Sequence, residues 1–140
     1  MAEKLLMGKL LMCDTCVIID SINGNDLLLF QLKQNSFILF INSIIEMELL
    51  QGSHDKKELR KIEQELKIFR RLEINQDILD TATHLVKKYS LSHNLKLADA
   101  LIGATALTYD LPLYTYNTRD FKFIPNIVLW DSSTTESGKF

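Results

Sequence analysis

The chain has 140 residues, of which 46% are hydrophobic and 24% are charged, and its formal net charge is -2. These values fit one globular domain and argue against a nucleic-acid binder that works through phosphate neutralisation alone. Two cysteines are too few for a disulfide framework, and the longest apolar runs fall far short of the roughly 18 residues of a membrane span. With no signal-peptide pattern at the N-terminus, we expect a cytoplasmic protein without a membrane segment.

Apolar runs and polar breaks in the first half of the chain predict strands that alternate with helices. Residues 10–13 form a short apolar run that we expect to be a buried strand leading through Asp14 into a helix. The Asn-Gly-Asn-Asp segment at 23–26 marks a turn. We then expect a helix at 27–33, a strand at 36–41 and a helix at 43–51 that ends at Gly52.

The second half continues the same alternation. Residues 55–70 carry apolar side chains at three- and four-residue spacing, which predicts an amphipathic helix. We expect a strand at 71–75, helices at 76–89 and 96–109, and strands at 111–115 and 126–130. The sequence therefore predicts an α/β domain over residues 1–130 with a parallel sheet covered on both faces, followed by a flexible polar tail at 131–140.

Four acidic residues stand at strand ends or inside apolar helices, where an ionised carboxylate is costly unless it is paired. They are Asp14, Glu48, Asp99 and Asp120. A parallel sheet gathers ligands beyond the carboxyl ends of its strands, and Asp14 and Asp120 both follow expected strands. Clustered carboxylates repel one another unless a cation neutralises them, and an all-oxygen set suits Mg²⁺ or Mn²⁺ better than zinc. We interpret the four acids as one divalent-metal site.

Each acid also has a purely structural explanation. Asp14 can cap a helix, Asp99 can stabilise a helix N-terminus, and Asp120 can set a turn. Within the helix at 43–51, a helical wheel does not distinguish Glu48 from Glu46, because both have apolar neighbours.

Four motifs, in order, resemble those of PIN-domain ribonucleases. Residues 13–20 (CDTCVIID) resemble the opening "LDTNVLID", and residues 48–52 (ELLQG) resemble "ELxxG". Residues 99–106 (DALIGATA) resemble "DALIAATA", and residues 115–125 (TYNTRDFKFIP) match "TxNxxDFxxIP". Each motif is weak alone, but the ordered set spans nearly the whole chain and is most similar to the VapC toxins of bacterial toxin-antitoxin pairs.

The resemblance implies a PIN-like three-layer α/β/α sandwich and a Mg²⁺-dependent endoribonuclease. By this resemblance, Asp14, Asp99 and Asp120 bind the metal and Glu48 completes the coordination shell. The "ELxxG" register selects Glu48 over Glu46. It also implies an RNA substrate such as tRNA or another structured RNA, a homodimer, and a cognate antitoxin that fills the acidic cleft.

The chain departs from the family pattern at two positions. Cys16 stands where the family usually has Asn, and Asn117 stands where some members have Asp. A thiol is a poorer hydrogen-bond donor and acceptor than an amide, so we expect weakened or altered activity. Thr15 and Asn117 are expected to support the site, and Arg119 and Lys122 are the best candidates for RNA contacts because they lie beside Asp120.

Three other functions are compatible with parts of the sequence. Cys13 and Cys16 form a C-x-x-C pair, as in thiol-disulfide proteins. An aspartyl phosphatase would also place Asp14 after its first strand, but its usual second Asp is Cys16 here. The third alternative is a PIN-like domain that binds RNA or protein with its metal site idle.

The histidines His54, His84 and His93 have no ligand spacing, so we expect them on the surface or in loops.

Overall fold

The structure, a computed structural model, describes residues 8–131. Within these residues, four strands form one parallel sheet in the order β3-β2-β1-β4. The strands are β1 (Leu10–Cys13), β2 (Ile38–Asn42), β3 (Arg70–Leu72) and β4 (Leu113–Tyr114). Because all four run in one direction, their carboxyl ends lie along one edge of the sheet.

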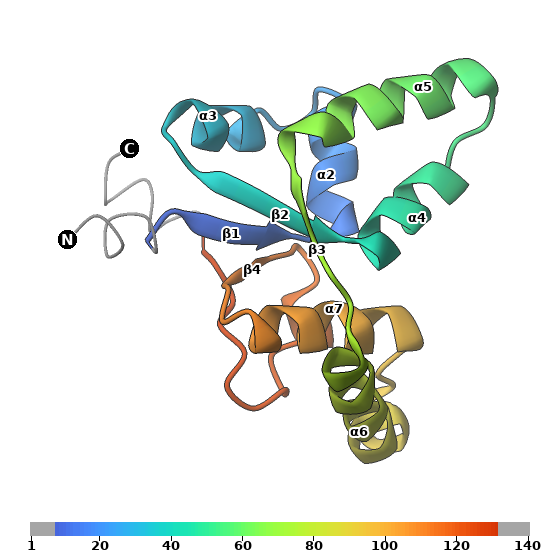
Figure 1. Cartoon of the computed structure of the whole chain (residues 1–140), viewed down its shortest axis with the longest axis vertical. Helices are drawn as coiled ribbons and strands as arrows, with labels where there is room; N and C mark the ends of the chain where they lie inside the picture. The colour runs from blue at the N-terminus through green and yellow to red at the C-terminus, as the bar shows by residue number, and fades with distance from the viewer. Residues whose placement is uncertain (1–7, 132–140) are drawn as a thin grey trace.

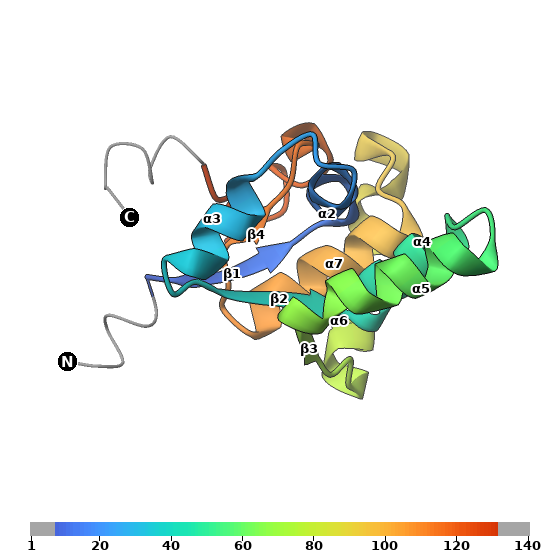
Figure 2. The same cartoon turned by 90° about the horizontal axis from the view of Figure 1, so that it is seen from above.

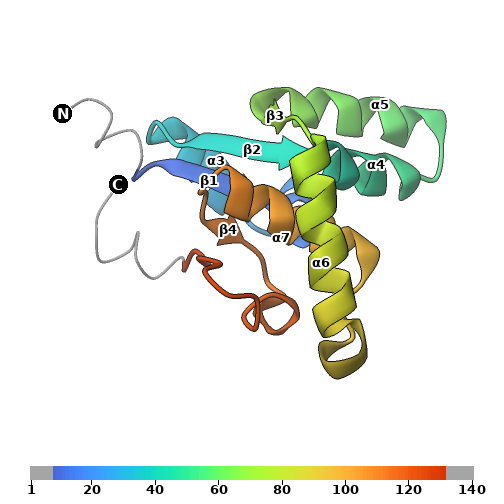
Figure 3. The same cartoon turned by 60° about the horizontal axis from the view of Figure 1, so that its bottom comes forward.

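Helices cover both faces of this sheet (Figure 1). One face carries α2 (Thr15–Ile22), α3 (Leu28–Gln34) and α5 (Lys56–Glu65), and Figure 2 looks down on them. The opposite face carries α6 (Gln76–His93) and α7 (Leu97–Thr108), which Figure 3 brings forward. Helix α4 (Ser43–Gln51) continues from the end of β2 and contacts α2, α5 and α7. The expected three-layer α/β/α sandwich is confirmed.

The core lies between the sheet and its two helical layers. The inner strands β1 and β2 are buried on both faces, as their near-continuous apolar sequences require in a parallel sheet. Leu11 and Leu39 pair across these strands, and neither side chain is exposed. From α7, Ile102 adds to the same core from the other layer. Among the described helices, none is long and apolar enough to cross a membrane.

Most expected elements occur near their expected bounds, and α4 has the bounds expected for it. The expected helix at 55–70 was wrong at its end, because α5 stops at Glu65 and a short 3-10 turn, η1 (Leu66–Ile68), leads into β3. There Arg70 pairs with Phe40 of β2, so sheet pairing overrides the helical spacing. The expected strand at 126–130 was also wrong. It contributes only an isolated bridge between Leu129 and Leu113.

Helix α6 is longer than expected and runs to His93, where Asn94 ends it in the left-handed conformation with φ 56°. The expected turn at 23–26 is present, and Gly24 supplies its positive φ of 75°. The expected tail lies, from residue 132 onward, outside the described residues.

A buried asparagine ties the end of β2 to the opposite layer. Asn42 is fully buried, and its Oδ1 accepts a hydrogen bond of 3.0 Å from the Ile45 backbone N–H, capping α4. Its Nδ2 donates to Thr105 Oγ1 of α7 at 3.0 Å. The contact between α4 and α7 is therefore fixed by a polar bond as well as by apolar packing. This contact sets the relative positions of the helices that carry Glu48 and Asp99.

We predict that Asn42→Ala destabilises the fold by about 2 kcal/mol or more, because it removes a helix cap and leaves a buried Ile45 N–H unpaired. Asn75→Ala is the matched control. Asn75 caps α6 through the Ile78 N–H at an exposed position, so its loss should cost only about 1 kcal/mol. Urea unfolding of both variants measures the difference, and equal losses would contradict the role assigned to Asn42.

Candidate active site

Asp14 stands between β1 and α2, at the carboxyl edge of the sheet. Its backbone N–H donates to the Tyr114 carbonyl at 2.9 Å, so β1 and β4 are paired up to this residue. One carboxylate oxygen accepts from the Thr15 N–H at 2.7 Å, and the other accepts from Thr115 Oγ1 at 2.8 Å. The side chain is only 5% exposed. Asp14 is thus a helix cap through one oxygen, while the other oxygen is held from β4.

Burial raises the pKa of Asp14 above its ordinary value, and the negative charge of Asp120 adds to this rise. Hydrogen bonds from Thr115, Thr15 and Cys16 act in the opposite direction because they stabilise the carboxylate. The side chain is therefore oriented by several donors, and no ion pair to it is present among residues 8–131.

Glu48, rather than Glu46, reaches the neighbourhood of Asp14. The Thr15 hydroxyl donates to Glu48 Oε1 at 2.9 Å, so Thr15 links α2 to α4 through its side chain and touches Asp14 through its backbone. Glu46 instead pairs with Arg71 at 3.4 Å, beside β3. The sequence could not distinguish these two acids by helical position, and their partners now separate them.

Asp99 lies in the first turn of α7, where its side chain is partly buried. Burial and then the negative charges of Asp14, Asp120 and Glu48 raise its pKa to about 6. An effect of this kind requires the three other carboxylates to lie nearby. Asp99 therefore lies within electrostatic reach of the three other acids, which come from three other segments of the chain.

Asp120 ends the 3-10 turn η2 (Thr118–Asp120), which follows β4 after three residues, and its side chain is exposed. The next residues anchor the turn, since Phe121 and Ile124 are buried. They pack against Gly103 of α7, where an added Cβ would lie 3.0 Å from Ile124 Cδ1. The small face of α7 thus receives the segment after η2, and this contact holds Asp120 on the side of the sheet that carries Asp99.

The residues expected to support the site lie around the acids, with different roles. Asn117 donates from its backbone N–H to Thr115 Oγ1 at 3.0 Å, and its side chain is exposed. Arg119 and Lys122 are exposed beside Asp120. Sequence reasoning missed Thr115, which is 4% exposed and bonds to Asp14. The available signal was its position, since a polar residue directly follows the apolar pair Leu113 and Tyr114.

The position of Cys16 brings a thiol into the acidic site. Its sulfur lies 3.7 Å from Asp14 Oδ2 and 3.6 Å from Thr115 Oγ1, and it accepts from the Tyr116 N–H at 3.4 Å. Burial raises the pKa of the Cys16 thiol. Cys13 is fully buried and its pKa is raised much further, and both cysteines are free. Thiol-disulfide exchange needs an accessible thiolate, so this geometry disfavours the C-x-x-C alternative.

The four acids fit a hard divalent cation by the chemistry of their donors, which are all carboxylate oxygens. Among residues 8–131, no three acidic, His or Cys side chains already converge on one ion position. Convergence would need rotation of exposed side chains such as Glu48 and Asp120, which change rotamer readily. Metal binding therefore stays a prediction.

The three histidines are exposed, as expected, and His54 lies in the loop between α4 and α5.

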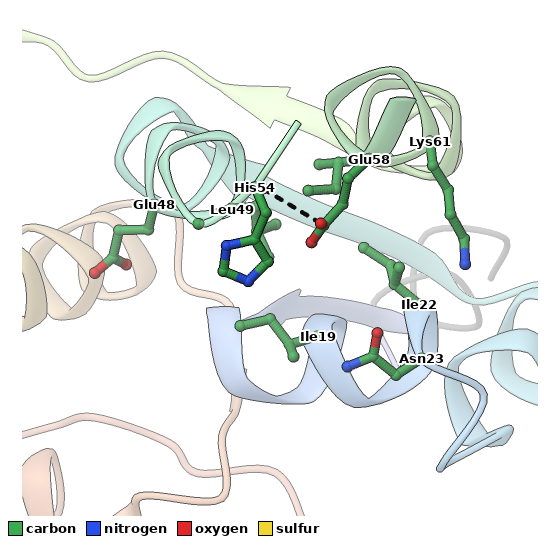
Figure 4. Close-up of a pocket in the computed structure, with 10 residues that line it drawn as sticks. Ile19, Ile22, Asn23, Glu48, Leu49, His54, Glu58 and Lys61 are labelled. Atoms are coloured by element: carbon green, nitrogen blue, oxygen red, sulfur yellow. Dashed lines mark hydrogen bonds between the residues drawn. The ribbon is translucent and has the colours of Figure 1, made fainter. Parts of the chain in front are cut away.

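A groove of about 360 Å³ lies between α2, α4 and α5 (Figure 4). Ile19, Ile22 and Leu49 contribute to its apolar lining. Glu48 stands at one end with its carboxylate pointing away from these side chains, and Lys61 stands at the other end (Figure 4). The dashed bond in Figure 4 joins the His54 N–H to Glu58 at 3.3 Å.

Fold and site together define an α/β protein with a carboxylate cluster at the carboxyl edge of a parallel sheet. A sequence model of the PIN domain family matches residues 11–126. The chain belongs to the PIN domain family.

Characterised relatives agree with this assignment. Ribonuclease VapC19 of Mycobacterium tuberculosis is 29% identical over 118 residues, which cover 81% of this chain and 94% of that protein. A chain of a toxin-antitoxin complex from Klebsiella pneumoniae is 31% identical, with a TM-score of 0.65 and coverage of 84% and 94%. A chain of VapBC2 from Rickettsia felis, solved with a promoter DNA fragment, shares the fold with a TM-score of 0.74 at 23% identity, covering 87% and 99%. The resemblance to VapC toxins is confirmed.

The raised pKa of Asp99 predicts how stability depends on pH when no divalent cation is added. Between its ordinary value of 3.8 and about 6, the folded state holds a proton that the unfolded chain releases, so stability falls as pH rises through this range. Asp99→Asn stays neutral. We expect its free energy of unfolding to exceed that of the native chain by about 1 kcal/mol at neutral pH, after allowance for solvent screening.

Urea unfolding in EDTA at acidic and neutral pH measures this difference. Asp110→Asn is the control, because Asp110 is an exposed acid just after the other end of α7. Added Mg²⁺ should stabilise the native chain more than Asp99→Asn. Identical pH dependence in the native chain and Asp99→Asn would show that the carboxylates do not repel one another at this position.

Proposed function

We propose that the chain is a metal-dependent endoribonuclease, the toxin of a toxin-antitoxin pair. The observation that carries the proposal is the hydrogen-bonded arrangement at the carboxyl edge of the sheet, where Thr115 and Thr15 hold Asp14 and Thr15 also bonds Glu48. The rise in the pKa of Asp99, caused by burial and then by Asp14, Asp120 and Glu48, supports it. Four carboxylates from separate segments thus share one edge of the sheet, and among residues 8–131 the structure shows no ion pair to any of them. The relatives named Ribonuclease VapC support RNA as the substrate.

The chain's own residues would prepare the site for hydrolysis of a phosphodiester. Asp14, Asp99 and Asp120 would bind Mg²⁺, or Mn²⁺, with Glu48 completing the shell. When bound, the ion supplies the charge that neutralises the carboxylates and the phosphate and lowers the pKa of an attacking water. Thr115 and Thr15 hold Asp14 in one orientation, as partners of metal ligands commonly do.

Substrate binding would depend on basic side chains beside the acids. Arg119 and Lys122 are exposed on either side of Asp120 in the sequence and can contact phosphates that flank the cleaved bond. Cys16 gives Asp14 a weaker hydrogen bond than the Asn usual at this position would give. We therefore expect lower turnover than in relatives that keep the Asn.

We predict that Asp99→Asn lowers metal-dependent RNA cleavage by about a hundredfold or more, because it removes one charged ligand from the site. End-labelled total tRNA, incubated with Mg²⁺, Mn²⁺ or EDTA, gives the measurement. Asp110→Asn is the control and should cleave like the native chain. RNA binding, measured by filter retention, should survive in Asp99→Asn.

Other outcomes of this assay would redirect the proposal. Cleavage retained in Asp99→Asn would refute the site assignment. RNA binding without cleavage under any metal condition would favour the alternative of a PIN-like binding domain whose metal site is idle.

We further propose that a segment of the antitoxin occupies the groove between α2, α4 and α5. Several solved relatives are described as toxin-antitoxin or VapBC complexes, which supports a partner of this kind. The groove offers apolar walls to an apolar segment, and Glu48 at its end can pair with a basic side chain. An antitoxin bound there would reach the acidic site through Glu48.

We predict that Ile19→Glu weakens antitoxin binding by about tenfold or more, since a charge would be buried in the apolar wall. Leu79→Glu is the matched control. Ile19 is 43% exposed and Leu79 is 41% exposed, but Leu79 lies on α6 on the opposite face of the sheet. Co-purification with the product of the adjoining antitoxin gene measures binding. Equal loss in both variants would remove the groove from the proposal.

The homodimer expected from the resemblance is also part of the proposal. Leu91 is 100% exposed and Leu97 is 73% exposed, on either side of the short link between α6 and α7. Large apolar side chains exposed near each other mark contact surfaces more often than chance. They support a subunit contact near the end of α7 that carries Asp99.

A further inference from the structure

A second cavity, of about 480 Å³, adjoins the acidic site on the β4 side and has no role in the function proposed above. Thr115 belongs to both places, because it lines this cavity and its hydroxyl donates to Asp14 at 2.8 Å. Three aromatic side chains line the cavity: Tyr114, Tyr116 and Trp130. A group attached to a phosphate at the carboxylates would therefore meet aromatic rings next.

Tyr116 presents the most exposed of these rings, at 44%. Its hydroxyl donates to Asp26 at 2.8 Å, and its backbone N–H donates to Cys16 at 3.4 Å, so both ends of the residue are held. The ring also meets Tyr114 edge to face, with centroids 5.9 Å apart, and Tyr114 meets Trp130 at 4.8 Å. A ring fixed in this way loses little conformational entropy when another ring stacks on it.

The chemistry of the lining favours a neutral planar group over a phosphate. Among the described residues, the cavity is lined by no Lys or Arg. Thr118 adds a hydroxyl that can donate or accept. A nucleobase meets these conditions, since it has a flat apolar face for stacking and polar edges for hydrogen bonds.

We propose that this cavity binds an unpaired nucleobase next to the phosphodiester that the carboxylates hold, with the base stacked on Tyr116. The proposal rests on the ribonuclease function proposed above and adds to it a base-binding site with named residues. A base within a duplex already stacks on its neighbours and cannot enter the cavity. We therefore expect the cavity to distinguish a single strand from a duplex.

The chain's single tryptophan lines the cavity, which makes its fluorescence a direct report of occupancy. The full-length chain carrying Asp99→Asn is titrated with a single-stranded oligoribonucleotide and with the same strand in a perfect duplex. We expect saturable quenching of Trp130 by the single strand and much weaker quenching by the duplex. This comparison needs no change at Tyr116, so it stays decisive even if a variant there fails to fold.

Variants in the same background locate the stacking ring. Tyr116→Ala should weaken binding of the single strand by about tenfold, the usual effect of losing one base-aromatic stack. Tyr116→Phe keeps the ring and should retain most of the affinity. The matched control is Tyr109→Ala. Tyr109 is 37% exposed and also held through its hydroxyl, at 2.8 Å from the Glu73 carbonyl, but it caps the far end of α7.

Three results would overturn the proposal. The first is RNA binding by filter retention with no change in Trp130 emission, or with equal affinity in Tyr116→Ala. The ribonuclease proposal would then still stand if the native chain cleaves RNA and Asp99→Asn does not. The second is quenching by the antitoxin but not by RNA, which would assign the cavity to a protein partner. The third is absence of both RNA binding and cleavage in every chain, which would reject the two proposals together.

Discussion

Repulsion among carboxylates at the carboxyl edge of the sheet is the constraint on which the arrangement of this molecule depends. Asp99 shows it most clearly, because burial raises its pKa first and the charges of Asp14, Asp120 and Glu48 then add to the rise. A fold that keeps four like charges together without a cation gives up stability to do so. The surrounding bonds therefore have two effects, since they hold the acids in place and they oppose their separation.

The parallel topology explains why these particular segments meet. In the order β3-β2-β1-β4, β1 lies between β2 and β4, so the residues that follow these three strands emerge side by side. Asp14 follows β1 directly, α4 with Glu48 follows β2, and the turn with Asp120 follows β4. Helix α7 brings Asp99 from the opposite layer, and Asn42 bonds that helix to the end of β2. Each acid thus belongs to a different connection of the same sheet edge.

The sequence predicted the features that depend on local pattern. The bounds of α4 followed from apolar spacing and Gly52, and the positions of Asp14 and Asp120 followed from the strands before them. It failed where a distant strand decides the local structure. The residues after Glu65 keep a helical apolar spacing, but pairing with β2 draws them into β3.

The same limit applies within the site. Glu48 and Glu46 are equivalent on a helical wheel, and only the contacts with Thr15 and Arg71 distinguish them. Thr115 looked like an ordinary strand residue, and its bond to Asp14 joins residues 101 positions apart in the sequence. The proposed metal and the proposed RNA are groups outside the chain, so the pattern and the fold support their binding only through the residues that would contact them.

Glu48 connects the acidic site to the apolar groove, and this shared position has a consequence for inhibition under the proposed function. A partner in the groove that places a basic group against Glu48 would supply positive charge to the four carboxylates. Such a partner would relieve the same repulsion that a divalent cation relieves, so the two would compete for one electrostatic role. Inhibition would then need no contact with the aromatic cavity on the β4 side. An inhibited complex would therefore lose its affinity for the metal before it lost its affinity for an unpaired base.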